Sequence, residues 1–470
     1  MHKLSSYPKL IESLQKLVFF ERASAHILAG CLPKIRALSI KVGVSQHFYE
    51  SMAQAHRLRG ILSALDYKAS SLLLASKDWV RLMVWVDSLP DTDQVLSALY
   101  LGIKPRLLNE YDQVLANADP LFDAQLLELI NSYLPRAEAQ RNWFVAALDR
   151  RTEPQGFAER WNFANPQPDI PLDEAVWAPL DRVPSALRPE GSYRGKNGEL
   201  AITPRDVLRD PKGIGIFLHN NINEEYTTLE LSGRNSYEHP DMPWEFHLSM
   251  ARHVADEARH VQIQERLAAC YGVRYGDYPF SVTHYDMLYS FDPCEPGSKH
   301  ELLWRLLLRM TYHEGLALDS NAFEIERRTY LGQQDIARVF HHLLVDEVSH
   351  VESGLRWGRM LAQEYCFDVL EERNKARNYY LAKENHQRLR FIVKRPKRAI
   401  SEGKRLLMAR QNNDLPYAIK LNVQLRRQAG FSEADIQQVL EWGIYPVDVQ
   451  PKSARTGPRE ADVGFRRVGI

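Results

Sequence analysis

The sequence predicts an all-α protein built around a bundle of four long helices, and three observations lead to this prediction. Apolar residues recur at intervals of three and four through residues 1–150, as in "FDAQLLELINSYL", which is typical of amphipathic helices. Long helical stretches follow at 218–236, 244–271, 300–329 and 334–364. Prolines and turn-forming residues are concentrated between such stretches, where they end helices. Four helices of this length bury their apolar faces by packing as a bundle.

The length and the proline distribution predict how the chain is divided. At 470 residues it is too long for one hydrophobic core, and a typical domain of about 150 residues suggests two or three domains. The predicted parts are a helical domain over 1–150, a proline-rich connector over 151–216, the bundle over 217–365 and a helical extension over 366–470. The extension contains a basic stretch at 388–410 and ends in a polar tail that we expect to be loose.

Composition excludes several classes of protein. Sixty basic and sixty acidic residues leave no net charge, so composition alone favours neither nucleic acid nor an anionic membrane as a partner. The four cysteines are too scattered for a disulfide framework or a zinc knuckle: Cys31, Cys270, Cys294 and Cys366. No apolar run approaches the roughly 18 residues of a membrane span. We therefore expect a soluble, cytoplasmic protein with no membrane partner.

The motif Asp-Glu-x-x-His occurs twice, as "DEARH" at 256–260 and "DEVSH" at 346–350. Random placement predicts about one Glu-x-x-His in a chain of this composition, and a single copy is usually a solvated helix motif. Both copies fall inside predicted helices, where residues three apart share a face, so Glu257 points with His260 and Glu347 with His350. The stripe around Glu347 is apolar. Because burying an unpaired carboxylate costs roughly several kcal/mol, a metal ion is the simplest partner.

The other two helices of the predicted bundle contain glutamates at a matching distance. Glu314 precedes Glu347 by 33 residues, and the adjacent Glu224 and Glu225 precede Glu257 by 33 and 32. Each half of the bundle is thus a helical hairpin with one Glu followed by Glu-x-x-His. This arrangement brings four carboxylates and two imidazoles together between the helices.

The ligand types indicate which metals the site would bind. Four carboxylates with neutral imidazoles match the charge of two divalent ions. Oxygen-rich ligands without a thiolate favour iron or manganese over a structural zinc ion. We therefore predict two iron ions, or one iron and one manganese, with Asp256 and Asp346 accepting the remaining N–H of the ligating histidines. His253, four residues before Glu257, is either a seventh ligand or a buried, hydrogen-bonded histidine.

Three segments resemble a known superfamily: "HVADEARHVQIQERLAACYGVRYGDYPF", "HEGLALDSNAFEI" and "LLVDEVSHVESGLRW". At these residues the sequence resembles the ferritin-like di-iron carboxylate superfamily. It looks most like an uncharacterised bacterial branch, a domain of unknown function distantly akin to the tRNA hydroxylases. The resemblance covers residues 216–365 and extends to 415–431. It implies a ferritin-like fold and Glu225, rather than Glu224, as the first-helix ligand, but it implies no substrate.

These observations favour a non-haem dimetal oxygenase or oxidase, which would use O2 to hydroxylate, desaturate or N-oxygenate an organic substrate. The substrate would be a small molecule or a modified residue, and a monooxygenase would need an electron-transfer partner. One alternative is iron oxidation, storage or trafficking. Another is an RNA- or phosphate-binding protein that uses the basic stretch 388–410, with the metal as a structural clamp. The roughly 300 residues outside the bundle suit substrate enclosure better than a ferritin cage.

A weaker repeat lies in the N-terminal domain. Glu21 and His56 are 35 residues apart, as are Glu225 and His260, but Ala53 stands where Glu257 would be. Either this domain is a degenerate second bundle or the spacing is a coincidence. We expect no metal there.

Overall fold

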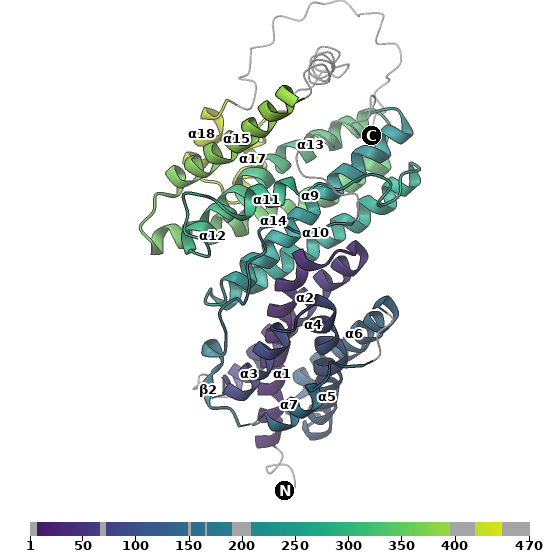
Figure 1. The fold of residues 1–470 in the computed structure, drawn as a ribbon, viewed down its shortest axis with the longest axis vertical. Coiled ribbons are helices and arrows are strands. Elements are labelled where there is room, and N and C mark those ends of the chain that lie inside the picture. Colours follow the sequence, from purple (N-terminus) through teal and green to yellow (C-terminus); the bar gives the residue numbers. More distant parts are fainter. Residues whose placement is uncertain are drawn as a thin grey trace, which may run out of the picture. The chain divides into compact units, whose positions relative to one another are not determined.

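The computed structural model describes residues 7–65, 72–148, 152–164, 167–189, 208–394 and 419–443. Within these ranges the chain is mostly helical, as Figure 1 shows. The strands of the described residues are β1 (Leu74–Ala75) and β2 (Ile170–Pro171), which pair antiparallel. The predicted all-α class is therefore confirmed.

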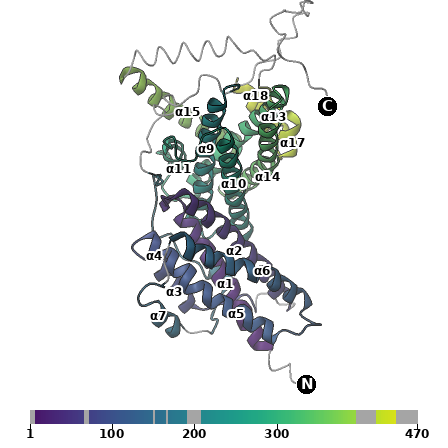
Figure 2. The ribbon, with the colours of Figure 1, turned by 90° about the vertical axis from the view of Figure 1, so that its right-hand side faces the viewer.

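Contacts between residues divide the chain into two units that are not the predicted domains. Unit 1 comprises Met1–Pro189 and Leu229–Ala258, and unit 2 comprises Glu190–Thr228 and Arg259–Ile470. The predicted boundary near residue 216 differs from this division. The reason is that two long helices, α9 (Pro211–Glu238) and α10 (Trp244–Cys270), each contribute residues to both units. Figure 2 labels both helices in a second view.

Unit 1 is built from helices of the N-terminal part of the chain. Its elements before α9 are α1 (Tyr7–Cys31), η1 (Leu32–Lys34), α2 (Leu38–Ala64), β1, α3 (Lys77–Asp87), α4 (Thr92–Ser97), η3 (Ala98–Ile103), α5 (Lys104–Asn117), α6 (Ala124–Leu148), α7 (Phe157–Phe163), β2 and η4 (Leu172–Glu174). Long helices α1 and α2 pack against each other. Ser76 and Asp91 cap α3 and α4 by accepting hydrogen bonds from backbone N–H groups. The first N–H groups of a helix have no acceptor within the helix, so these caps supply one.

The proline-rich segment contains only short elements over its described residues up to 189, as predicted. It ends earlier than predicted, because α9 (Pro211–Glu238) begins at Pro211 rather than near residue 217. Proline suits the start of a helix, since its fixed φ is helical and its missing N–H would have no partner there.

The remaining elements are α10 (Trp244–Cys270), α11 (Thr283–Tyr289), α12 (Lys299–Arg305), η5 (Leu306–His313), α13 (Glu314–Tyr330), α14 (Gln334–Glu364), α15 (Val369–Lys394), α17 (Val423–Gln428) and α18 (Glu433–Glu441). Helices α10 and α14 match the predicted stretches closely. The third predicted helix is one continuous run of α12, η5 and α13. Helix α11 lies in a segment that the sequence predicts as loop.

Element η5 is a π-helical segment that leads directly into Glu314. In a π-helix the hydrogen bonds run from residue i to i+5, so residues five apart lie on the same side. On an α-helix of 3.6 residues per turn, residues five apart are separated by about 140°. Side chains before and after η5 therefore have a different phase from the one that α-helical periodicity predicts.

Four helices share one hydrophobic cluster in unit 2. Its side chains come from α9, α10 and α14, with one more from α13: Ile214, Leu218, Leu267, Ala268, Ile336, Val339, Phe340 and Leu343, with Ile325 packed against them. The C-terminal extension adds a second cluster, in which Phe431 and Val439 pack with Leu318 and Leu355. Of the predicted basic stretch, 388–394 lie in the last turns of α15, and 395–410 lie outside the described residues, as does the chain after 443.

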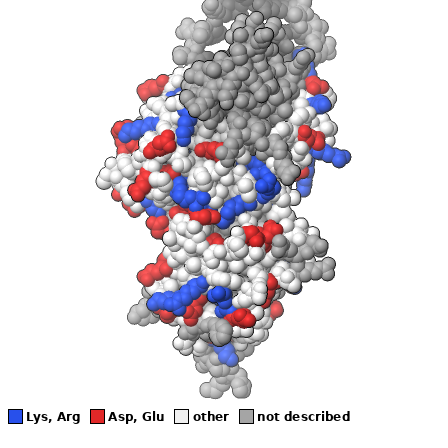
Figure 3. All heavy atoms as spheres, viewed as in Figure 1, with Lys and Arg blue, Asp and Glu red and all other residues white. Residues whose placement is uncertain are grey.

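Surface charge is mixed on the face drawn in Figure 3, where basic and acidic side chains are interspersed among the described residues. This agrees with the balanced composition. No helix in the described part of the chain is long and apolar enough to cross a membrane.

Candidate metal centre

Both Asp-Glu-x-x-His motifs lie within long helices and face the interior. Helix α10 carries Glu257 and His260, which are 1% and 0% exposed, and α14 carries Glu347 and His350, which are 5% and 2% exposed. The glutamate and the histidine of each motif thus share a helix face, as predicted, and that face is buried. These four side chains have the placement that a metal ligand in the core of a helical bundle requires.

The glutamates predicted on the other two helices join these residues. Glu225 of α9 lies with Glu257 and His260, and the potential ligand atoms of the three residues are all within 4.8 Å of one another. A second group within the same limit consists of Glu314, Glu257, His350 and His253. Glu257 belongs to both groups and is the residue that they share.

Glu347 lies beside the second group, next to His350. Its Oε2 lies 3.6 Å from Nδ1 of His350, and Oε2 of Glu314 lies 4.0 Å from the same nitrogen. The structure thus brings all six predicted ligands together in pairs or triplets. Four buried carboxylates at this separation repel one another, and divalent cations would offset that repulsion.

Hydrogen bonding distinguishes the adjacent Glu224 and Glu225, which periodicity cannot separate. Gln264 Nε2 donates to Glu225 Oε1 at 2.6 Å, and Glu225 faces the other ligands. Glu224 instead forms an ion pair with His284 of α11. Burial would raise the pKa of Glu224, but the charge and hydrogen bond of His284, together with Arg309, lower it to about 2. The arrangement therefore favours Glu225 as the α9 ligand.

Asp346 contacts His260, a predicted ligand of the other motif. Its Oδ2 lies 3.0 Å from Nε2 of His260, so Nδ1 of that ring, which is buried, is the nitrogen placed for a metal. Burial would raise the pKa of Asp346, but hydrogen bonds from His260 and Arg259 lower it to about 2. This is the orienting contact predicted for Asp346. The other predicted orienting residue, Asp256, is buried and lies 3.7 Å from the guanidinium of Arg252.

His253 shows features of both interpretations that the sequence allows. Its Nε2 lies 3.2 Å from Glu257 Oε1, and its Nδ1 lies 3.2 Å from the hydroxyl of Ser232. The ring is therefore hydrogen-bonded in the core, yet it is also within ligand distance of the second group. It would hold Glu257 in place whether or not it binds an ion itself.

A cavity of about 510 Å³ borders the cluster in unit 2. Three of the predicted ligands line it, namely Glu225, Glu314 and Glu347. Phe217, Leu316, Phe340 and Leu343 form apolar parts of its wall. The other polar and charged lining residues are Asn221, Glu224, Arg309, His313, Ser320, Asn321 and Glu324. A volume between roughly 300 and 1,000 Å³ is typical of small-molecule sites.

Arg309 is a residue of this cavity that the sequence did not indicate. It lies in η5, is buried, donates from Nη2 to the hydroxyl of Thr228, and places Nε 3.8 Å from Glu314 Oε1. Arg309 and Glu314 are five residues apart, so α-helical periodicity would separate them. The π-helical spacing of η5 brings the two positions closer to one side of the helix.

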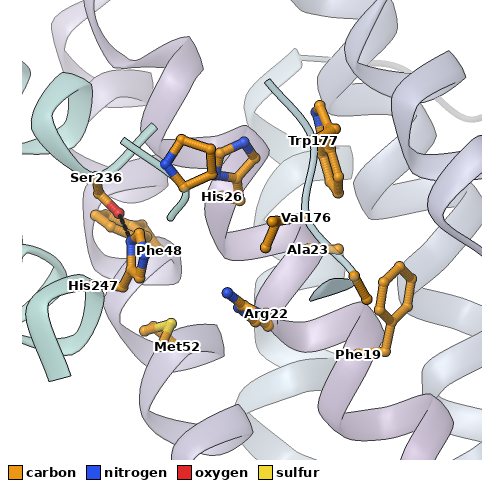
Figure 4. A pocket seen from close by; sticks show the side chains of 12 residues that line it. Phe19, Arg22, Ala23, His26, Phe48, Met52, Val176, Trp177, Ser236 and His247 are labelled. Atoms are coloured by element: carbon orange, nitrogen blue, oxygen red, sulfur yellow. Dashed lines mark hydrogen bonds between the residues drawn. The ribbon is translucent and has the colours of Figure 1, made fainter. Parts of the chain in front are cut away.

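Unit 1 contains a much smaller cavity, of about 20 Å³ (Figure 4). Arg22 extends into it and donates to the carbonyl of Leu172, and Ser236 is bonded to His247 at its edge. Burial lowers the pKa of Arg22 to about 10. This volume accommodates about one water molecule, so it is too small for an organic substrate.

The N-terminal repeat contains a lysine beside its glutamate. Glu21 is fully buried, its two oxygens lie 3.2 and 3.3 Å from Nζ of Lys104, and Tyr111 donates to it at 3.1 Å. The ammonium group of Lys104 thus takes the place that a metal ion would need. This agrees with the expectation that no metal binds there. Sequence spacing did not indicate Lys104, because it lies 83 residues away from Glu21 in the chain.

A family model described as "Protein of unknown function (DUF455)" matches residues 183–437, slightly more than half of the chain. No curated protein and no solved structure matches this chain.

Proposed function

The chain belongs to the DUF455 family, and we propose that it is a non-haem dimetal oxygenase or oxidase built on a ferritin-like four-helix bundle. In this proposal Glu225, Glu257, His260, Glu314, Glu347 and His350 hold two iron ions, or one iron and one manganese. The substrate is an organic molecule that is hydroxylated, desaturated or N-oxygenated, and an external donor supplies electrons where the reaction consumes them.

The donor set fits such a pair of ions. Carboxylate and imidazole ligands without a thiolate suit iron and manganese, and four carboxylates match two divalent charges. The two overlapping groups of ligand atoms, with Glu257 in both, support a pair of ions rather than one. When bound, the metal pair would supply the electrons and the Lewis acidity that dioxygen reduction requires.

The chain's own residues would orient and enclose the reaction. Asp346 fixes the ring of His260 through the contact at 3.0 Å, since a hydrogen bond to the second ring nitrogen sets the tautomer of a ligating histidine. Gln264 holds the carboxylate of Glu225 in place by donating a hydrogen bond to Oε1. Phe217, Phe340 and Leu343 form apolar parts of the cavity lining, which would exclude water from a reactive centre.

One observation carries the proposal, namely the cavity of about 510 Å³ lined by three of the carboxylate ligands. Oxidation of iron for storage requires a passage for ions but no chamber with an apolar wall. A cavity of this size beside the ligands is what an enzyme acting on an organic substrate needs. This favours substrate oxidation over metal storage.

The experiment is anaerobic loading of the purified protein with Fe(II), followed by elemental analysis and exposure to dioxygen. We expect close to two ions per chain and an absorption change that ends when those two ions are oxidised. Continued uptake of many ions per chain would instead support iron storage. One tightly bound zinc ion with no iron uptake would contradict both.

A further inference from the structure

We propose that the substrate is a neutral molecule with an amide-like group, that is, a carbonyl oxygen beside an N–H, joined to an apolar ring or chain. Asn221 and Asn321 bind the amide-like group, and the apolar part lies farther from the ligands. This inference rests on the proposed dimetal function and deepens it by naming the class of substrate. It follows from the direction in which the cavity extends and from two amides in its wall.

The cavity extends from the predicted metal ligands to a pair of aromatic rings. Phe217 lies eight residues before Glu225 on α9, and Phe340 lies seven residues before Glu347 on α14, and all four residues line the cavity. The centroids of the two rings are 6.1 Å apart, and Ile325, in the second half of α13, packs in the same hydrophobic cluster. At 1.5 Å of rise per residue, this aromatic end lies about 10–12 Å from the ligands along the helices.

Two asparagines line the cavity between the ligands and the aromatic end. Asn221 lies four residues before Glu225, and Asn321 lies seven residues after Glu314. Residues four or seven apart on an α-helix share a face, so each amide is on the same side of its helix as a predicted ligand. Along their helices the amides lie about 6 and 10 Å from those ligands.

Neither of these amides has a hydrogen-bond partner among the described residues. Asn321 is only 7% exposed, and Asn221 is partly buried. Each side chain offers an oxygen that accepts and an NH2 group that donates, and buried polar groups gain when such atoms are paired. The best complement is a group that itself accepts and donates, as a carboxamide, a lactam or a urea does.

Charged side chains of the wall outside the predicted ligands are paired within the protein. Glu224 forms an ion pair with His284, and the charge of Arg309 also favours the ionised form of the same carboxyl group. Glu324 accepts from Arg328 at 3.0 Å. A charged ligand would have to compete for these partners after losing its own hydration. The wall therefore favours a neutral ligand.

Hydrocinnamamide is a suitable probe, because two methylene groups join its primary amide to a phenyl ring. This arrangement suits Asn221 and Phe217, which are four residues apart on α9, or about 6 Å of helix rise. Benzylacetone has a methyl group in place of the NH2 group, and hydrocinnamate has a second oxygen there. The three molecules have nearly the same shape and differ in hydrogen bonding and in charge.

The test is calorimetric titration of each probe into protein loaded with Mn(II) in the absence of a reductant. We expect hydrocinnamamide to bind about tenfold more tightly than benzylacetone, because the ketone has no N–H to donate to the asparagine oxygens. Hydrocinnamate should bind more weakly than the amide, since its charge must be desolvated. Equal binding of the amide and the ketone, or tightest binding of the carboxylate, would overturn the inference.

Variants test whether the two asparagines are the origin of this preference. Asn321→Leu and Asn221→Leu each remove an amide with little change of volume, and each should reduce the preference for hydrocinnamamide over benzylacetone by at least about threefold. Asn378→Leu, at an exposed position of α15, is the matched control and should keep the full preference. Because Asn221 is less buried, its variant keeps the test decisive if Asn321→Leu does not fold.

Metal content and the circular dichroism spectrum are measured for every protein, which separates the two proposals. A wild-type protein that takes up no metal contradicts the proposed function, even if it still prefers the amide. An unchanged preference in folded, metal-loaded Asn321→Leu and Asn221→Leu overturns this inference alone.

Discussion

In unit 1, the carboxylate of Glu21 lies against the ammonium of Lys104, and that of Glu230 lies against Lys41 and Arg188. In unit 2, Glu225, Glu314 and Glu347 line one cavity and face histidines and other carboxylates. Cations of the chain therefore neutralise these two buried acids of unit 1. The acids of the second arrangement are the ones that we propose as metal ligands, and the comparison sets them against acids that are paired closely with a lysine or an arginine.

The largest expected effect comes from removing a cation of unit 1. Lys104→Met should destabilise the protein by about 3–5 kcal/mol, because it leaves the carboxylate of Glu21 buried without its partner. Urea unfolding measures this change. The double variant Lys104→Met with Glu21→Leu should recover most of the loss, and Arg81→Met, whose ion pair with Asp78 is mainly exposed, should cost less than about 1 kcal/mol. An unaffected single variant would mean that Glu21 needs no counter-charge.

Metal binding should stabilise the protein through the candidate metal centre. Ions that bind only the folded state add about 2.7 kcal/mol at a hundredfold excess over the dissociation constant. Thermal melts with Mn(II) and with a chelator measure this difference. His350→Ala should abolish most of it, while His56→Ala in the N-terminal repeat should leave both the stabilisation and the metal content unchanged. Loss of metal from folded His56→Ala would reveal a second site.

Acid should act on unit 1 through a buried histidine. Burial, with a smaller effect of Lys104, lowers the pKa of His47 to about 3. Between about pH 3 and 6.5 the unfolded chain binds a proton that the folded protein does not, so stability falls as the pH falls below 6.5. From pH 7 to pH 5 this contribution is about 2 kcal/mol.

His47→Gln tests this origin, since an amide can still bond to Tyr100, which lies 2.7 Å from His47 Nδ1. Unfolding by urea at pH 7 and at pH 5 should show a smaller loss of stability in this variant than in the wild type. His341→Gln, at an exposed position of α14, serves as the control. An equal loss in all three proteins would assign the acid sensitivity to other groups.

The smallest effect should come from the contact that orients His260. Asp346→Asn replaces the charged acceptor and should lower metal affinity by about tenfold, as changes in residues that orient metal ligands do. Competition with a chelator measures the affinity. Asp335→Asn, on the same helix and bonded to Tyr271 at the surface, should have no effect. Equal affinities in Asp346→Asn and the wild type would show that His260 keeps its orientation without this carboxylate.

Helical periodicity predicted the helices that carry the candidate metal ligands. Helix α14 begins and ends where its apolar stripe does, at residues 334 and 364, and the paired motifs place Glu347 and His350 in the core. These signals are local, since residues three or four apart on one helix must share a face. The interior position of the candidate ligands could therefore be predicted before any tertiary contact was known.

Other features depend on contacts that local spacing does not encode. Separating Glu225 from Glu224 requires His284, on a short helix in a segment predicted as loop. The position of Arg309 depends on the π-helical segment, which changes the phase of the helix that carries Glu314. Lys104 reaches Glu21 from 83 residues away. In each case the missing information is a partner distant in sequence or a departure from ideal helical geometry.

The passage of α9 through both units limits how the protein can be shortened. A chain trimmed to the family-matched residues 183–437 keeps Glu230, Arg234 and Tyr237 of α9 but loses α1 and α2. Glu230 would lose Lys41, and Arg234 would lose the carbonyl of Gly30, to which it donates at 3.2 Å. The ring of Tyr237 would lose His26, which stacks on it at 4.7 Å. We therefore expect residues 183–437 to leave part of α9 uncovered, and α1 and α2 must be expressed with them if α9 is to be covered along its length.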